Sequence, residues 1–123
     1  MRSRRLFIVV AVAALALALT VAPAYALHRA YQGSDYAETT GDHAAIWACD
    51  RESDGHGVWA DYYDFNIRLY PALVDGNGSQ PGCAFSDIYP QHIYKFRVCE
   101  RYVACSAWVY PYGLRDKPRS PRS

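Results

Sequence analysis

The chain has 123 residues, with 13 lysine and arginine residues against 12 aspartate and glutamate residues. Three of the arginines (Arg2, Arg4 and Arg5) lie at the N-terminus, so the chain that follows carries 10 basic and 12 acidic side chains. This acidic balance argues against nucleic acid as a partner, because phosphate binding needs clustered lysine and arginine. The length is that of one small domain.

The N-terminus has the three parts of a secretory signal peptide over residues 1–26. Residues 1–5 are basic, residues 6–22 are apolar apart from Thr20, and Ala24-Tyr25-Ala26 places small residues where signal peptidase cleaves. We therefore expect cleavage after Ala26, release of the remaining chain to the extracellular space, and no stable membrane association afterwards.

Two alternatives for the N-terminus stay open. The apolar run could remain as an uncleaved membrane anchor, although it is short for a span. The sequence Ser3-Arg4-Arg5-Leu6-Phe7-Ile8 also resembles a twin-arginine export motif, so the export route is not fixed by the sequence.

The segments after the signal peptide are predicted to be strands, because Tyr, Val, Ile and Trp dominate them and none has a sustained helical period. In chain order we expect a leader strand or mobile arm over 27–42, a strand with two apolar faces over 43–50, and a long strand over 58–69. A short strand at Leu73-Val74 and a hairpin of 93–100 with 105–110 follow, while 84–91 is ambiguous.

Asp-Gly turns at Asp54-Gly55 and Asp75-Gly76 separate these strands, and such turns are typical of β-hairpins. The fold class is therefore predicted to be all-β. We expect a single small antiparallel β-sandwich or barrel over residues 43–114, held by disulfides. Residues 115–123, where prolines alternate with basic and serine residues, are predicted to be a disordered basic tail.

The four cysteines all follow the signal peptide, and an even number in a small exported domain predicts two disulfides. They are Cys49, Cys83, Cys99 and Cys105. The sequence permits three pairings, of which we expect Cys99–Cys105 and Cys49–Cys83.

The first pairing also predicts the register of the last hairpin. If Cys99 faces Cys105, the loop is centred on Tyr102, and Phe96 and Tyr94 lie opposite Trp108 and Tyr110. Aromatic pairs of this kind contribute roughly 0.2–1 kcal/mol each.

The acidic turn after the first strand resembles a calcium-binding loop in its alternating oxygen-bearing side chains. The candidate ligands are Asp50, Glu52, Asp54 and Asp61. Glutamate at the third position, aspartate at the twelfth and flanking strands in place of helices all depart from that pattern. We therefore expect a solvated turn, no metal or other cofactor, and no dependence on calcium.

No catalytic motif is recognisable in the chain. The histidines (His28, His43, His56 and His92) are scattered, and the two disulfides would leave no cysteine as a nucleophile. Ser53 and Ser106 lack the sequence context of a nucleophilic serine. We expect no catalytic residues and a protein that is not an enzyme, although a catalytic triad is defined by geometry and a small hydrolase stays open as an alternative.

Aromatic residues make up 15% of the chain and supply the remaining candidates for binding. Trp47, Trp59 and Trp108 are expected to fill the core of a small sandwich. Tyr62, Tyr110 and Tyr112 are the aromatic residues expected at the surface, where such rings stack on sugars or anchor proteins.

Three stretches resemble a pattern of small secreted proteins of actinobacteria. They are 54–63 (Asp54-Gly55-His56-Gly57 and the strand after it), Asp75-Gly76-Asn77-Gly78 before Cys83, and Phe96–Glu100 with Cys105–Val109. The resemblance covers most of the exported domain and implies a secreted β-protein with two disulfides. It implies no activity, because that group has no assigned function.

The chain is also similar in size and disulfide number to the small amylase inhibitors of such bacteria. Their Trp-Arg-Tyr triplet is absent, so amylase inhibition is not implied.

The sequence therefore favours a non-enzymatic extracellular domain that binds an extracellular protein or a cell-wall glycan. The first alternative is an inhibitor of a secreted protease or glycosidase that acts through a rigid loop such as Val74–Gly82. The second alternative is the small hydrolase.

Overall fold

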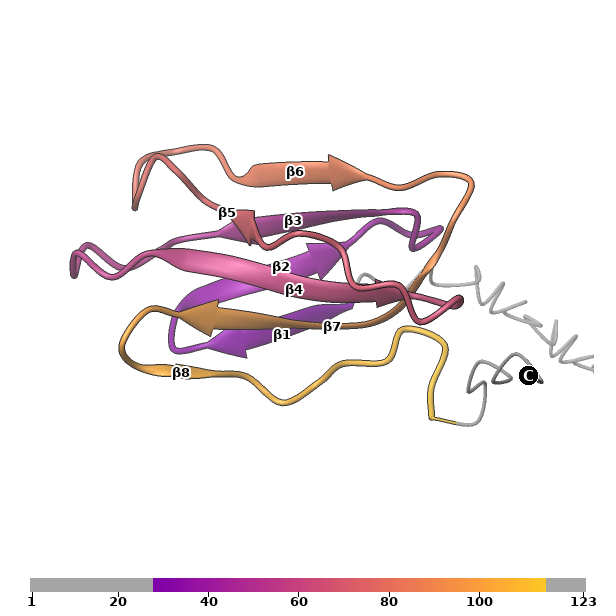
Figure 1. Cartoon of the computed structure of the whole chain (residues 1–123). Helices are drawn as coiled ribbons and strands as arrows, with labels where there is room; N and C mark the ends of the chain where they lie inside the picture. The colour runs from indigo at the N-terminus through magenta and orange to yellow at the C-terminus, as the bar shows by residue number, and fades with distance from the viewer. Residues whose placement is uncertain (1–27, 115–123) are drawn as a thin grey trace, which may run out of the picture.

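Residues 28–114, the part of the chain that the computed structural model describes, form eight strands in two four-stranded antiparallel sheets. The sheets lie face to face as a sandwich (Figure 1), which confirms the predicted all-β fold. The first sheet has the order β1-β2-β3-β6, and the second sheet has the order β5-β4-β7-β8. The predicted signal peptide (1–26) and basic tail (115–123) lie outside the described residues.

The strands of the first sheet are β1 (Arg29–Gln32), β2 (Asp35–Thr39), β3 (Ala45–Cys49) and β6 (Ala84–Asp87). The strands of the second sheet are β4 (Val58–Asp64), β5 (Leu73–Val74), β7 (Ile93–Glu100) and β8 (Ala104–Cys105). Within residues 28–114, no helix reaches the length and apolar character needed to cross a membrane.

The core between the sheets is built largely from small side chains. Ala37 and Ala48 of the first sheet and Ala60 of the second are fully buried, and Ile46 and Phe96 are the largest side chains that are completely enclosed. The alanines on the inward faces of both sheets leave the space between the sheets to a few larger side chains, among them Phe96 and Tyr62.

The tryptophans consequently lie elsewhere, and the prediction that they fill the core is wrong. Trp47, Trp59 and Trp108 are each half-buried. Trp47 and Trp59 occupy the strand positions that alternate with the core residues, and therefore lie on the outer faces of the two sheets. Trp47 packs there against Phe85 of the neighbouring strand β6, with ring centroids 5.2 Å apart.

Tyr62 is also placed differently from the prediction, which had it at the surface. It lies on the inward side of β4 and is 2% exposed. Its hydroxyl donates to Oγ of Ser86 in β6 at 2.8 Å, and its ring stacks on Tyr70. A buried tyrosine needs a partner for its hydroxyl, and Ser86 supplies it from the opposite sheet.

The segment expected to be a leader strand or arm instead contributes the hairpin β1–β2, and β2 lies between β1 and β3. The hairpin shows no clear hydrophobic period, because polar side chains occupy some of its buried positions. These side chains form ion pairs and hydrogen bonds there. Arg29 pairs with Glu38 at 3.0 Å, and Thr39, which is completely buried, lies 3.1 Å from Nδ1 of His43.

The long strand expected over 58–69 ends at Asp64. The buried Asp64 carboxylate accepts hydrogen bonds from the backbone N–H groups of Asn66 and Arg68 and from the Tyr70 hydroxyl. Ile67 adopts a φ of 61°, and Leu69 pairs back with Tyr63. One buried aspartate thus organises a tight turn where the sequence shows only an apolar run.

Both predicted disulfides, Cys49–Cys83 and Cys99–Cys105, are confirmed. Their presence points to an oxidising environment, which is typical of extracellular proteins. Cys99 faces Cys105 as predicted, and Tyr102 lies in the connecting turn with a φ of 65°.

The predicted register of the last hairpin is wrong beyond the disulfide. Phe96 pairs with Val109 and not with Trp108. The N–H of Ser106 donates to the carbonyl of Val98, which fits the predicted register. One extra residue is therefore inserted after Ser106, before Val109 pairs with Phe96. Such a bulge turns the next side chain to the other face of the sheet, and Trp108 is the residue that it moves outward.

Candidate functional site

The outer face of the second sheet carries a group of aromatic and charged side chains. From β4 the outward residues are Trp59, Asp61 and Tyr63, and their cross-strand partners on β7 are Cys99, Arg97 and Lys95. Trp108, turned outward by the bulge, lies across them. We call Trp59, Asp61, Tyr63, Lys95, Arg97 and Trp108 the aromatic platform.

Asp61 fixes the charged centre of the platform. Its Oδ2 lies 3.0 Å from both Nε and Nη2 of Arg97, and its Oδ1 accepts a hydrogen bond from Nε1 of Trp59 at 3.1 Å. The Asp61 and Arg97 side chains are 20% and 33% exposed, so the ion pair is accessible from the solvent. The pair therefore holds a tryptophan and a guanidinium in fixed orientations on a rigid strand pair.

Trp108 is supported by two cations. The Arg97 guanidinium carbon and the Lys95 ammonium nitrogen each lie 4.5 Å from a Trp108 ring centroid. The Lys95 ammonium also lies 4.7 Å from the ring of Tyr63, which meets Trp108 edge to face at 5.6 Å. Cation–π and edge-to-face contacts of this kind orient the rings without burying them.

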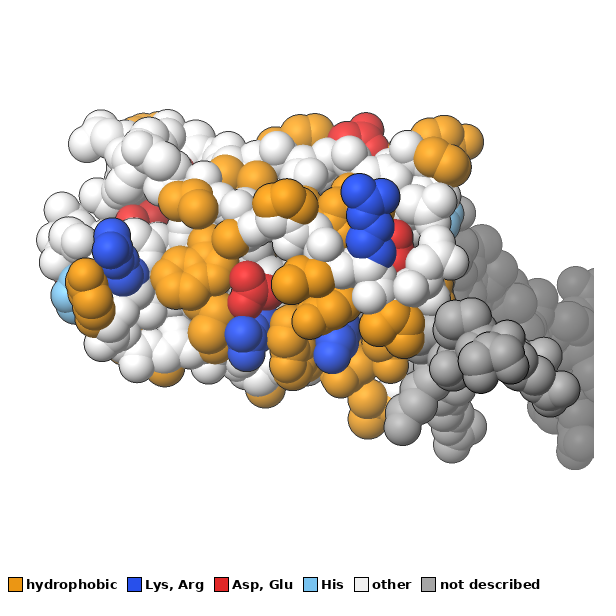
Figure 2. Space-filling view, viewed as in Figure 1, with side chains coloured by type: hydrophobic (Ala, Val, Ile, Leu, Met, Phe, Trp, Pro, Cys, Tyr) orange, Lys and Arg blue, Asp and Glu red, His pale blue; other side chains and the backbone are white. Residues whose placement is uncertain are grey.

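Exposed apolar residues extend the platform at its edge. Val74, the partner of Trp59 in β5, is 55% exposed, and Leu69, which pairs with Tyr63, is 54% exposed. Figure 2 shows hydrophobic side chains gathered over β4, β7 and the segment after β8, with basic and acidic side chains among them. The face thus combines an apolar surface with fixed charges.

Two of the tyrosines predicted to be at the surface lie beside this platform. Tyr110 is half-buried against Tyr94, with ring centroids 5.5 Å apart, and Tyr112 is 40% exposed. Tyr112 contacts the ring of Phe65, which in turn contacts Tyr94. These rings form a continuous aromatic edge. Tyr112 is at the surface, as expected, and Tyr110 is partly exposed, whereas Tyr62 is buried.

The structure does not unite the four candidate ligands of the calcium-like loop. Asp61 lies on the platform with Arg97, whereas Glu52 and Asp54 belong to the loop between β3 and β4. Glu52 and Asp54 instead converge with two carboxylates that the sequence pattern did not include. These are Asp35, at the start of β2, and Glu100, at the end of β7.

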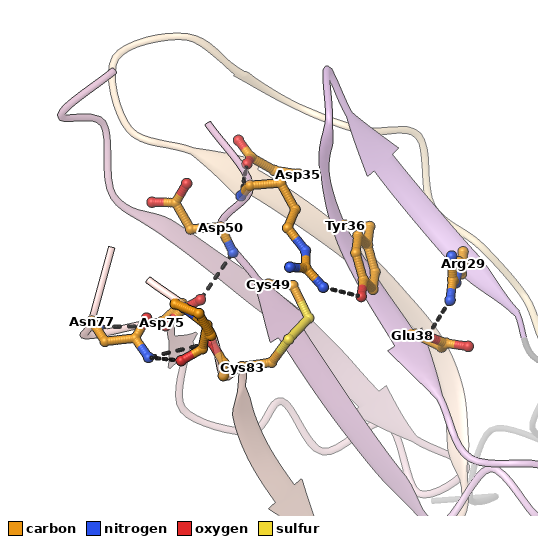
Figure 3. The surroundings of a disulfide bond; sticks show 12 residues. Arg29, Asp35, Tyr36, Glu38, Cys49, Asp50, Asp75, Asn77 and Cys83 are labelled. Carbon is orange, nitrogen blue, oxygen red and sulfur yellow. Dashed lines mark hydrogen bonds and ion pairs between the residues drawn. A yellow bond between two sulfur atoms is a disulfide. The ribbon is translucent and has the colours of Figure 1, made fainter. Parts of the chain in front are cut away.

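A polar cleft of about 450 Å³ opens beside these carboxylates. It is lined by the β3–β4 loop and by the loop after β5, and its acidic lining residues are Asp50, Glu52 and Asp75. The N–H of Asp50 donates to Oδ2 of Asp75 at 2.9 Å, and the Asn77 amide donates to the carbonyls of Pro81 and Gly82 (Figure 3). The disulfide Cys49–Cys83 ties the two loops together at their bases.

Burial and neighbouring carboxylates raise the pKa values of three of these acidic residues. Burial raises the pKa of Asp35, and the nearby charge of Glu52 adds to the effect. Burial likewise raises the pKa of Asp50, with a contribution from Asp35. A hydrogen bond with Asp54 raises the pKa of Glu100, and burial acts in the same direction. These directions are those expected for like charges crowded in a poorly solvated site.

The histidines and serines singled out by the sequence are not assembled around a reactive hydroxyl. His43 faces Thr39, but both residues are buried, and Ser106 Oγ donates to the carbonyl of Ala107. His56 lies 3.4 Å from Glu100 and 3.7 Å from Asp54. His92 contacts Tyr112 and the carbonyl of Asp42 near the aromatic edge.

Comparisons with protein-family models, with curated proteins and with solved structures find no match.

Proposed function

We propose that this protein is a secreted, non-enzymatic binding domain that holds an anionic cell-wall glycan on the aromatic platform. The observation that carries the proposal is the arrangement of Trp108 and Tyr63 around Lys95 on the outer face of β4 and β7. Sugar rings stack their apolar faces on aromatic side chains and need polar groups beside them for their hydroxyls.

The charges on the platform support an anionic ligand. Asp61 neutralises Arg97, but no Asp or Glu within residues 28–114 forms an ion pair with Lys95. The ammonium group is held by the rings of Tyr63 and Trp108 and is therefore available to a carboxylate or phosphate of the ligand. A rigid strand pair presents these groups at little cost in conformational entropy on binding.

The test is co-sedimentation of the purified domain with cell envelope isolated from the producing organism. We expect binding that survives exhaustive protease treatment of the envelope and weakens as salt is raised. Binding that disappears after protease treatment would identify a protein partner and contradict the glycan assignment. Recovery of the domain only in the supernatant would contradict an envelope-binding role.

Secretion is the second part of the proposal, and the two disulfides support it. We expect the intact mass of the protein from culture medium to show an N-terminus at Leu27. A product retained in the membrane with residues 1–26 attached would contradict release.

Inhibition of a secreted hydrolase is the second candidate function, and the hydrogen bonds and disulfide that constrain Val74–Gly82 favour it. Most of this loop is exposed, yet Asn77 bridges across it and Cys83 anchors its end. Canonical inhibition needs such a preorganised loop. Assays of secreted proteases and glycosidases with the wild type and with Asn77→Ala would test this function, and inhibition weakened by the substitution is the expected result.

A further inference from the structure

Four carboxylates and one imidazole meet at the end of the sandwich where β2 begins and β7 ends. One carboxylate oxygen from each of Asp35, Glu52 and Glu100 lies within 4.8 Å of the others. Glu100 also forms a second group with Asp54 and His56, whose ligand atoms lie within the same distance of one another. We call these five residues the acidic cluster.

The buried Asp35 carboxylate is not satisfied by the protein. Asp35 is 0% exposed, and its Oδ1 accepts a hydrogen bond from the N–H of Arg51 at 2.6 Å. Its Oδ2 is buried and has no hydrogen-bond partner. Burying a carboxylate oxygen without a hydrogen-bond donor costs free energy. A proton or a bound cation on Oδ2 would remove that cost.

The remaining charges do not neutralise the cluster. Within residues 28–114, the ion pairs of Asp54 and Glu100 are with His56, and none joins Asp35 or Glu52 to a lysine or arginine. The neighbouring Arg51 directs its guanidinium to the hydroxyl and ring of Tyr36. Nδ1 of His56 is itself buried and not aligned for a hydrogen bond. The cluster therefore has an excess of negative charge.

The carboxylate of Glu52 lies against the β1–β2 turn. A Cβ atom on Gly33 would lie 2.8 Å from Oε2 of Glu52, and Gly33 has a φ of +59°. The absence of a side chain at Gly33 thus lets the Glu52 carboxylate lie against the turn and reach Asp35. Glu52 also lines the polar cleft, which gives the cluster a route from the solvent.

We propose that the acidic cluster is a binding site for a calcium ion, with Asp35, Glu52 and Glu100 as its protein ligands and Asp54 beside them. Oxygens within 4.8 Å of one another can reach one ion at the roughly 2.3–2.6 Å typical of calcium. A site dominated by carboxylates suits a hard cation, whereas zinc prefers nitrogen and sulfur ligands. This ligand set differs from the calcium-like loop of the sequence, because Asp35 and Glu100 take the place of Asp50 and Asp61.

The test is calorimetric titration of the purified, disulfide-bonded protein with calcium chloride, together with melting curves in calcium and in chelator. We expect saturable binding and a melting temperature that rises with calcium concentration. Asp35→Asn and Glu100→Gln should each weaken binding by roughly tenfold or more, because each removes a charged ligand. Both variants should fold in chelator, since each relieves like-charge repulsion.

Asp61→Asn is the matched control, because it removes a carboxylate that belongs to the calcium-like loop but not to the acidic cluster. It should bind calcium as the wild type does. The proposal is overturned if the wild type shows neither heat nor a change in melting temperature at millimolar calcium. It is equally overturned if Asp61→Asn abolishes binding while Asp35→Asn leaves it intact, or if zinc alone binds.

Discussion

Asp61 and Arg97 face each other across β4 and β7 and form an ion pair, and the Arg97 guanidinium also stacks on the ring of Trp108. The pair links one tryptophan to another, because the same carboxylate accepts the indole N–H of Trp59. The orientation of both rings therefore depends on one partly exposed salt bridge.

Arg97→Lys is expected to alter the platform more than the stability of the fold. Lysine keeps the charge but loses the planar guanidinium that contacts both the carboxylate and the indole ring. We expect a loss of at most about 1 kcal/mol in the free energy of unfolding, because the pair is partly exposed. The near-UV circular dichroism of the tryptophans should change.

The matched control for Arg97→Lys is Arg29→Lys, in the ion pair with Glu38 on the other sheet. Within residues 28–114, Arg29 contacts tyrosines and no tryptophan, so the substitution should leave the near-UV signal of the tryptophans unchanged. An unchanged spectrum for Arg97→Lys would show that the pair does not orient Trp108.

The two disulfides should differ in their contribution to stability. Cys49 and Cys83 are separated by 34 positions and Cys99 and Cys105 by 6, so the first closes the larger loop. The chain-entropy argument gives roughly 4 kcal/mol for the first and roughly 2 kcal/mol for the second. Denaturant unfolding of the two paired Cys→Ala variants measures the difference. A greater loss from removal of Cys99–Cys105 would contradict the argument.

The stability of the β2–β3 turn should depend on pH through His43. This residue is 8% exposed, and burial, followed by the nearby His28, lowers its pKa below the usual 6.5. The unfolded chain therefore binds a proton more readily than the folded chain does. The contribution of neutral His43 is complete above pH 6.5 and is lost as the pH falls toward the lowered value.

The groups that face His43 are Thr39, His28 and Tyr112, with Asp42 and His92 beside them. The comparison variant is His43→Asn, because asparagine tolerates the left-handed φ of 56° at this position. Urea unfolding between pH 7 and pH 5 should show the wild type losing stability relative to the variant. The raised pKa values of Asp35, Asp50 and Glu100 act in the opposite direction, but equally in both proteins.

The sequence predicted those parts of the fold that depend on local patterns. A run of residues that is apolar on both faces identified β3, and the alternation of apolar and basic residues identified β7. The short loop between Cys99 and Cys105 identified one disulfide and thereby the other. The inward side of β4 was not identifiable in this way, because both of its faces carry aromatic rings. Tyr62 lies inside because it shares the inward face of β4 with Val58 and Ala60.

The candidate sites depend on contacts between residues that are far apart in the sequence, and local sequence patterns do not reveal such contacts. A single bulge after Ser106 moves Trp108 to the platform, and no local signal marks that bulge. The acidic turn was visible, but Asp35 and Glu100 join it only because β2 begins and β7 ends near the β3–β4 loop. Once the sandwich topology is known, the positions of Asp35 at the start of β2 and Glu100 at the end of β7 place both carboxylates beside this loop.

The affinity of the domain for protease-treated envelope glycan, measured for the wild type and for Trp108→Ala, tests the proposed binding function most directly. The matched control is Tyr89→Ala, which removes a ring that is 75% exposed but lies outside the platform. Unchanged far-UV spectra and melting curves would show that the variants fold.

We predict that Trp108→Ala weakens binding by roughly tenfold or more, as expected for a central aromatic contact, and that Tyr89→Ala binds as the wild type does. Equal affinity of the wild type and a folded Trp108→Ala variant would contradict the assignment of the platform as the binding face.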